Sequence, residues 1–209
     1  MTHDAYNSYF TQFGLPRHLH PDLAALEKQF YTLSRKLHPD RFASRPAAEQ
    51  EAALAQSSAL NDAYRTLKDP IQRTQYLLAL EGVELEEQSK SATEAARTSG
   101  AEKKQIVPPE LLEEVFELNM QLMEMKSAKQ MGEDDPALRN DLLAAKQGFD
   151  NRMAATQTEL ETLWTAWDTA EDAADEPAKV KAKDAMVTLL NKRSYIRNLV
   201  RDVNAALET

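Results

Sequence analysis

The stretch Leu33-Ser34-Arg35-Lys36-Leu37-His38-Pro39-Asp40-Arg41-Phe42 decides the fold of the N-terminal half. Before it, apolar residues recur at three- and four-residue steps, the pattern of one helix face: Leu23, Leu26, Phe30, Leu33 and Leu37. Pro39 disfavours helical geometry at the preceding residue and clashes with the turn behind it, so we predict that the helix breaks at His38. His38-Pro39-Asp40 therefore begins a loop.

The residues around this loop predict a small helical domain. A second long helix is marked by Ala53, Ser57, Leu60, Tyr64 and Leu67, and forms an antiparallel hairpin with the first. Asp69 and Pro70 suit the N-cap and first position of a further helix, which Gly82 closes. A short helical turn fits within residues 7–14.

The tripeptide His-Pro-Asp occurs twice, at residues 20–22 and at residues 38–40. At the first site it opens a helix, where Pro21 suits the first helical position and Asp22 the positive helix end. At the second site it lies at the exposed tip of a hairpin, where a rigid charged group is typical of recognition. We therefore expect only the second tripeptide to bind a partner.

The C-terminal half predicts a helical bundle after a linker. Residues 83–107 carry no sustained apolar stripe, which indicates the linker. Three helical segments are then expected, each started by a proline: Pro109 to about Met131, Pro136 to about Ala173, and Ala178 to about Leu207. No strand pattern appears. The predicted fold class is all-α, with an N-terminal helical hairpin domain at 1–82, the linker at 83–107 and a C-terminal three-helix bundle at 108–209.

Composition excludes several classes of function. Cysteine is absent, which excludes disulfides and thiolate metal sites. The N-terminus lacks the features of a secretion signal and no apolar run is long enough to span a membrane, so we expect a cytoplasmic protein with no membrane contact. The net charge of −9 opposes nucleic-acid binding. Residues 1–82 hold nine acidic and nine basic side chains, so the remainder, with 25 acidic and 16 basic, carries the whole charge.

The sequence resembles the J-domain family. The stretches that carry the resemblance fall in the family's order and spacing: Phe10 with Phe13-Gly14-Leu15, Leu33 to Phe42, Leu60-Asn61-Asp62-Ala63-Tyr64-Arg65-Thr66-Leu67-Lys68-Asp69-Pro70, and Arg73 to Tyr76. The resemblance implies that the chain activates a DnaK-type chaperone ATPase and is not itself an enzyme. In J-domains the tripeptide's aspartate is understood to pair with an arginine of the ATPase, a role that falls here to Asp40.

Charge near the second tripeptide is consistent with that partner. Residues 27–45 contain five basic side chains and two acidic ones, an excess that would steer and orient an acidic surface. Because no nucleophile or second catalytic carboxylate is placed beside the loop, His38 and Pro39 are expected to shape it and not to transfer protons. The expected chaperone-binding residues are Lys28, Arg35, Lys36, His38, Pro39, Asp40 and Arg41.

A closer resemblance is carried by the short N-terminal domain, by Phe42-Ala43-Ser44 and Gln75-Tyr76-Leu77-Leu78, and by the acidic C-terminal bundle. Over nearly the whole chain, these features resemble the HscB-type co-chaperones of iron–sulfur cluster assembly, of the bacterial type without a zinc module. The resemblance implies an HscA-type chaperone partner and an IscU-like scaffold protein as client, bound by an apolar patch on the bundle. Leu112 and Phe116, one helical turn apart, and Leu189 on the last helix are the expected client-binding residues. The alternative is that they face the bundle interior. Glu113 stands where relatives often carry an apolar residue, which predicts a smaller or differently centred patch.

Other interpretations stay open. The chain could serve a different client, or be a helical adaptor with no chaperone partner. His18 and His20 are too few for a metal site, and neither metal nor cofactor is expected. Trp164 and Trp167 fit bundle packing. Finally, four methionines could form an adaptable binding face or fill gaps in the core: Met120, Met123, Met125 and Met131.

Overall fold

The computed structural model describes residues 8–83, 85, 107–133 and 135–208. Helices are the only regular secondary structure in these residues, so the predicted all-α class is confirmed. The chain divides into two compact units. The N-terminal unit comprises residues 1–84 together with 164–183, and the bundle unit comprises residues 85–163 and 184–209. The inclusion of residues 164–183 in the N-terminal unit was not predicted, because the bundle was expected to hold them.

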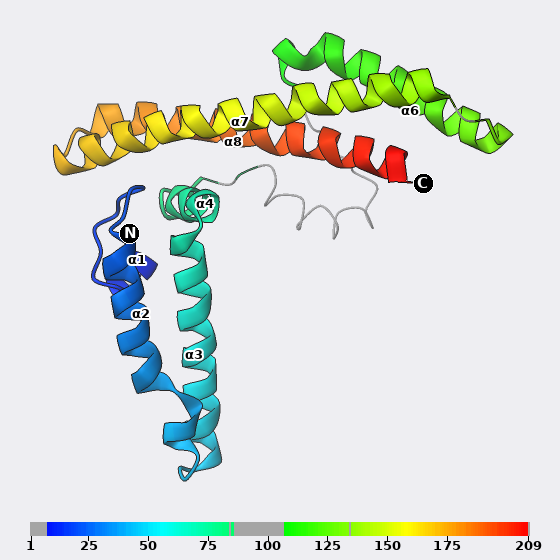
Figure 1. Ribbon diagram of the computed structural model, residues 1–209. Helices are drawn as coiled ribbons and strands as arrows, with labels where there is room; N and C mark the ends of the chain where they lie inside the picture. Colours follow the sequence, from blue (N-terminus) through cyan, green and yellow to red (C-terminus); the bar gives the residue numbers. More distant parts are fainter. Residues whose placement is uncertain (1–7, 84, 86–106, 134, 209) are drawn as a thin grey trace, which may run out of the picture. The chain divides into compact units, whose positions relative to one another are not determined.

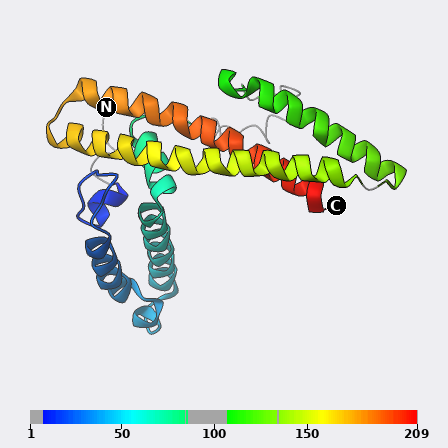
Figure 2. The same cartoon turned by 45° about the horizontal axis from the view of Figure 1, so that its top comes forward.

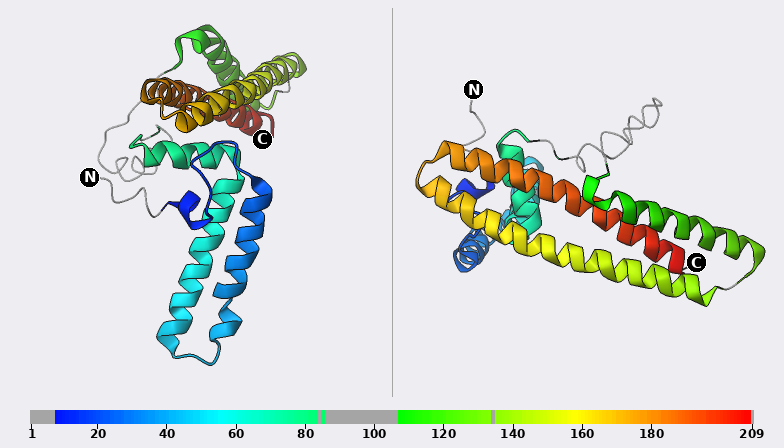
Figure 3. Two further views of the ribbon diagram at one scale, coloured as in Figure 1. Left: turned by 90° about the vertical axis from the view of Figure 1, so that its left-hand side faces the viewer. Right: turned by 90° about the horizontal axis from the view of Figure 1, so that it is seen from above.

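The N-terminal unit is built on an antiparallel helical hairpin. Its helices are α1 (Tyr9–Gln12), α2 (Leu23–Leu37), α3 (Ala47–Lys68) and α4 (Pro70–Leu80). Figures 1 and 3 show α2 and α3 lying side by side, and the ring of Phe30 on α2 stacks on Tyr64 of α3 with centroids 4.1 Å apart. The core is made of fully buried apolar side chains, among them Phe10, Phe13, Leu19, Leu26, Leu60, Leu67, Leu77 and Leu78. Their burial supplies the main stabilisation of this unit.

Aspartate caps start two of these helices. The side chain of Asp69 accepts the Gln72 N–H at 2.7 Å ahead of Pro70, as predicted. The start of α2 differs from the prediction. Asp22 has extended backbone geometry and accepts the Ala25 N–H at 2.9 Å, so it is the N-cap and the helix begins at Leu23. Pro21 therefore lies before the helix and not at its first position, because the cap needs the non-helical residue.

The bundle unit packs α6 against parts of two long helices. Its elements are the 3-10 turn η3 (Pro109–Leu111) and the helices α6 (Leu112–Met131), α7 (Pro136–Asp172) and α8 (Glu176–Glu208). Figure 2 shows α6 alongside α7 and α8, and one buried cluster joins them: Leu111, Val115, Leu118, Met125, Leu138, Leu142, Phe149, Ile196, Leu199 and Val203. The turn into α7 uses Gly132, whose φ of 74° favours glycine. Asp135 then caps α7 by accepting the N–H groups of Ala137 and Leu138, both at 3.0 Å.

The predicted linker at 83–107 lies almost wholly outside the described residues. The first described residues after it form η3, so the expected proline start at Pro109 opens a 3-10 turn and the α-helix itself begins at Leu112. The two long helices start and end within a few residues of their predicted limits.

Candidate functional site

The second tripeptide forms a short, exposed loop after α2. The helix ends at Leu37, and His38 has φ −61° and ψ 127°, the extended geometry that a residue before proline prefers. Residues Pro39–Phe42 then form one 3-10 turn, η2. The Asp40 side chain is 89% exposed. The break therefore falls at the predicted residue and places a carboxylate in solvent.

The His38 ring helps to hold this turn. Its Nδ1 lies 3.3 Å from the backbone N of Asp40 and 3.5 Å from Asp40 Oδ2. One Nδ1 atom cannot accept a hydrogen bond from the backbone N–H and also donate one to the carboxylate. The shorter contact is the one that caps η2, so we assign Nδ1 as the acceptor of the Asp40 N–H. This assignment leaves the carboxylate of Asp40 available to a partner.

Further hydrogen bonds fix the loop on both sides. Arg41 donates through Nη1 to the Arg35 carbonyl at 3.3 Å, which satisfies one of the last acceptors of α2. From α3, the Gln50 amide donates to the carbonyls of Ala43 at 3.2 Å and Arg45 at 2.8 Å. The loop is thus tied to both helices that flank it, and the exposed carboxylate stands on a rigid support.

The basic residues predicted for this region lie on the surface around the loop. Lys28, Arg35, Lys36 and Arg41 are all exposed, as are His38 and Pro39. Lys28 and Arg35 are seven residues apart on α2 and share one helix face. The structure therefore brings positive charge and the Asp40 carboxylate into one accessible region, which suits a partner surface of mixed charge.

An apolar face on α6 is the second candidate site. Four large apolar side chains are exposed at helical spacing: Leu112 (54%), Phe116 (70%), Met120 (56%) and Met123 (70%). We call these four residues the α6 apolar face. Their neighbours Leu111, Val115 and Leu118 point inward and are buried. The buried cluster of the bundle is formed from that inward side, and the α6 apolar face is not part of it.

Leu112 and Phe116 are therefore accessible, whereas Leu189 is not. Leu189 is only 6% exposed, so the expectation that it joins them on the surface is corrected: its side chain helps to fill the interior. Met125 is also buried, at 5%. The sequence left open which methionines face outward, although Met120 and Met123 continue the four- and three-residue steps that begin at Leu112.

Ion pairs fasten the start of α6 to its neighbours. Glu110 pairs with Lys192 of α8 at 3.1 Å, and Glu114 pairs with Arg152 of α7. A backbone N–H bond and the Lys192 ammonium lower the pKa of Glu110 below its ordinary value. These pairs hold the helix that carries the α6 apolar face in a defined rotation.

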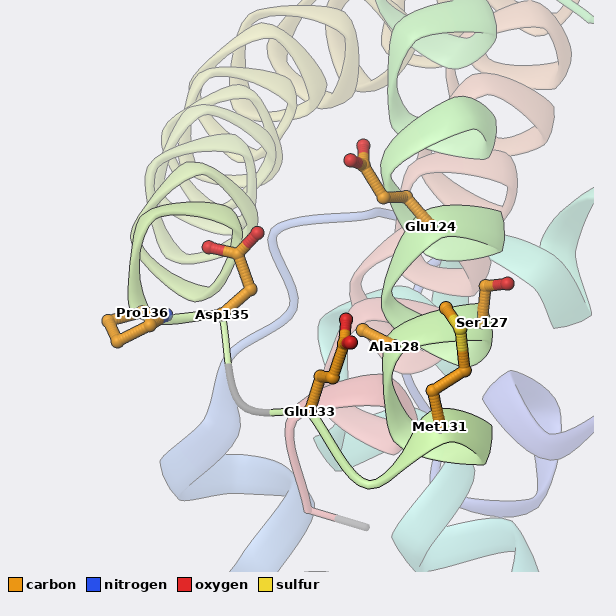
Figure 4. Close-up of a pocket in the computed structure, with 7 residues that line it drawn as sticks. All are labelled: Glu124, Ser127, Ala128, Met131, Glu133, Asp135 and Pro136. Carbon is orange, nitrogen blue, oxygen red and sulfur yellow. The ribbon is translucent and has the colours of Figure 1, made fainter.

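Figure 4 shows an open pocket at the turn between α6 and α7. It is lined by Glu124, Ser127, Ala128, Met131, Glu133, Asp135 and Pro136. Its lining combines one carboxylate from α6, Glu124, and two from the turn, Glu133 and Asp135, with the exposed Met131. Among the described residues, no group of three or more potential ligands could hold a metal ion.

None of the helices in the described ranges combines the length and apolarity needed to cross a membrane. His18 and His20, considered as metal ligands, instead contact carboxylates of Asp172 and Asp168 at 2.9 and 3.2 Å. The sequence had not singled out either aspartate. No sequence signal marked them, because their partners lie about 150 residues away along the chain.

Comparison with known proteins agrees with both the loop and the architecture. Residues 8–76 match the family model of the DnaJ domain. The structure is similar to chaperone HscB from Vibrio cholerae, at 24% identity and a TM-score of 0.53, over 96% of this chain and 98% of that one. It is also similar to the human co-chaperone protein HscB, at 23% identity and a TM-score of 0.52, over 97% of this chain and 83% of that one. Residues 8–76 therefore match the DnaJ domain, and the chain has a fold similar to that of these two HscB structures.

Proposed function

We propose that the chain is a co-chaperone which stimulates ATP hydrolysis by a DnaK- or HscA-type chaperone and delivers an IscU-like iron–sulfur scaffold protein to it. The chain would act in the cytoplasm and carry out no catalysis itself. The observation that carries the proposal is the Asp40 carboxylate, 89% exposed on a loop fixed from both flanking helices.

The chemistry of the loop supports activation of a partner. Because the backbone that carries Asp40 is already fixed, only its side chain loses conformational entropy when the carboxylate pairs with an arginine. The exposed Lys28, Arg35 and Lys36 would attract an acidic surface and set its orientation, while Asp40 supplies the opposite charge at one point. The chaperone-binding role of Lys28, Arg35, Lys36, His38, Pro39, Asp40 and Arg41 is part of this proposal.

The second half of the proposal rests on the α6 apolar face. Phe116 is 70% exposed at the middle of a row of four apolar side chains, an arrangement that suits an anchor for a protein partner. Exposed Glu113 and Glu117 border the row and would favour a client with basic residues around an apolar centre. Leu112 and Phe116 remain our proposed client contacts, with Met120 and Met123 added and Leu189 left out.

Single-turnover ATP hydrolysis by a DnaK-type partner tests the activating role. We expect wild type to accelerate hydrolysis and Asp40→Asn to reduce the stimulation by about tenfold or more, since a lost charged contact costs at least ~1.4 kcal/mol. Asp22→Asn is the matched control, because asparagine is an equally good N-cap and should preserve α2. Equal rates with and without the wild-type chain would favour a helical adaptor that has no chaperone partner.

Titration of the full chain with an apo scaffold protein tests the client role. We expect Phe116→Ser and Leu112→Ser to weaken binding, Phe116→Ser by about tenfold or more, as for a buried aromatic anchor. Leu143→Ser, at a 47% exposed position on α7, controls for the loss of an exposed leucine elsewhere. Tight binding by all three variants would move the client to another surface, and no binding by wild type would point to a different client.

A further inference from the structure

The first tripeptide, which the proposed function does not use, is engaged by the end of α7. Residues 17–20 precede α2 and lie outside any helix. Residues 164–183, at the α7–α8 turn, belong to the same compact unit as this loop. Contacts between these two segments, almost 150 residues apart in sequence, centre on one carboxylate.

Both oxygens of Asp168 accept backbone hydrogen bonds from the loop. Oδ1 accepts the Leu19 N–H at 2.6 Å, and Oδ2 accepts the His20 N–H at 2.8 Å. The His20 Nδ1 lies 3.2 Å from Oδ2 and must be the donor there, because a carboxylate only accepts. The Asp168 side chain is only 14% exposed. Hydrogen bonds to an ionised group are stronger than neutral ones, and this group receives three.

Neighbouring groups complete the enclosure of the loop. The fully buried Trp167 donates its Nε1–H to the Arg17 carbonyl at 3.3 Å. From α4, the buried Arg73 donates its Nε–H to the Leu19 carbonyl at 3.1 Å. Leu19 itself is 0% exposed. The peptide groups around Leu19 are thus held from both sides, by α4 and by the end of α7.

The turn that carries Asp168 is itself braced. Lys179 of α8 pairs with Glu171 of α7 at 2.7 Å, and its ammonium lies 5.4 Å from the centroid of the Trp167 ring. Asp168 also acts on Arg73, where its charge raises the pKa of the guanidinium against the larger, lowering effect of burial. The carboxylate therefore acts on both the loop and the arginine, from a position outside the DnaJ domain match at 8–76.

We propose that Asp168 is a positioning residue: it clamps residues 17–20 and so fixes the start of α2, which makes the end of α7 part of the activating unit. The inference rests on the proposed function, since α2 begins at Leu23 and ends at the Asp40 loop. On this proposal the first tripeptide makes an intramolecular contact. The activating unit of this chain then extends beyond residues 1–82.

Amide hydrogen exchange of the full chain tests the clamp directly. In Asp168→Ala, we expect the Leu19 and His20 amides to exchange about tenfold faster or more, because each loses a bond to a charged acceptor. Asp141→Ala, an exposed aspartate on the same helix, should leave both rates unchanged. Asp168→Asn keeps one acceptor oxygen, so the two amide exchange rates should lie between those of wild type and of Asp168→Ala. Unchanged exchange in Asp168→Ala would overturn the proposal.

Stimulated ATP hydrolysis by a DnaK-type partner tests the positioning role. We expect Asp168→Ala to raise the concentration for half-maximal stimulation by about threefold to tenfold, the cost of ordering one or two loop residues on docking. The maximal rate should stay unchanged, unlike in Asp40→Asn. If exchange accelerates but this concentration does not change, the clamp is structural only and the proposal is wrong.

Two further outcomes are decided by the same design. If Asp168→Ala fails to fold by circular dichroism, the milder Asp168→Asn carries both measurements. If the wild-type chain itself gives no stimulation, the proposed function and the positioning role both fail, while amide exchange still decides whether the clamp exists.

Discussion

The two His-Pro-Asp tripeptides have identical side chains and opposite surroundings. At residues 20–22, the histidine and its backbone N–H bind Asp168, and Asp22 is used as the N-cap of α2 at 2.9 Å from Ala25 N. At residues 38–40, the histidine ring accepts the backbone N–H of Asp40, and the aspartate stays 89% exposed.

The comparison indicates that the two tripeptides differ in which of their polar groups already have a hydrogen-bond partner within the chain. At the start of α2, helix geometry requires an acceptor at the cap, so the Asp22 carboxylate already has a partner within the chain. At the end of α2, the cap of η2 is the histidine ring, and the Asp40 carboxylate stays exposed. Position relative to the helix ends therefore decides which aspartate is used within the chain and which one faces solvent.

The largest effect that would test this comparison is on stability, at Arg73. This buried side chain donates to the carbonyls of Leu19 and Leu67, at 3.1 and 2.5 Å. We expect Arg73→Ala to lower the free energy of unfolding by about 2–4 kcal/mol, because two buried carbonyls lose their donor. Denaturant unfolding measures it, with exposed Arg65→Ala as a control that should cost less than about 0.5 kcal/mol. Equal losses of unfolding free energy in the two variants would show that other contacts stabilise the loop of the first tripeptide.

The second-largest expected effect comes from Pro39, the residue that ends α2. In Pro39→Ala, His38 is no longer barred from helical geometry, so α2 can extend and the Asp40 loop loses its fixed shape. We expect stimulation of a DnaK-type ATPase to fall by about tenfold, the cost of ordering one residue on docking. Pro21→Ala should leave the stimulation unchanged, because the Asp22 cap still starts α2 at Leu23. Similar losses in both variants would remove the distinction between the tripeptides.

A smaller effect separates the two aspartates by stability alone. Asp22→Ala should lower the free energy of unfolding by about 1 kcal/mol, because the N-cap is lost. Asp40→Ala should stay within about 0.5 kcal/mol of wild type, since an exposed side chain away from a cap contributes little. Thermal unfolding of the two variants in parallel gives the measurement. Substitution of Asp22 should therefore lower stability more than substitution of Asp40, whereas substitution of Asp40 should lower ATPase stimulation more. The interpretation is contradicted if one aspartate has the larger effect in both measurements.

The sequence predicted those features that depend on neighbouring residues. Pro39 ended α2 where expected, and Asp69 with Pro70 started α4, because caps and proline act within a few residues. The exposure of Leu112 and Phe116 was expected only from the family resemblance, and burial in the bundle interior was left open as the alternative. The start of α2 was predicted two residues too early, at Pro21. Proline suits the first helical position and the following aspartate suits the N-cap, so the two residues are compatible with either start.

Features that depend on distant residues were missed. Leu189 and Phe116 are both apolar residues on helices, and only the packing of three helices decides that one is buried and the other exposed. Trp164 and Trp167 were assigned to bundle packing, whereas Trp167 also donates to the Arg17 carbonyl. Asp168 gave no signal at all, since its partners are backbone groups of a loop 149 residues away by sequence. Spacing along a helix carries no information about such contacts.

The smallest effect concerns the edge of the first tripeptide's loop. His18 Nε2 lies 2.9 Å from Asp172 Oδ1, but the Asp172 side chain is 70% exposed, so solvent screens the pair. A double-mutant cycle with His18→Gln and Asp172→Asn should give a coupling energy of about 0.5 kcal/mol that shrinks as salt is added. Asp168, only 14% exposed, should couple more strongly to His20 in the parallel cycle with His20→Ala and Asp168→Ala. If Asp172 coupled as strongly as Asp168, surface ion pairs would stabilise this loop as much as the buried carboxylate does. The contrast with the exposed carboxylate of Asp40 would then not depend on Asp168 alone.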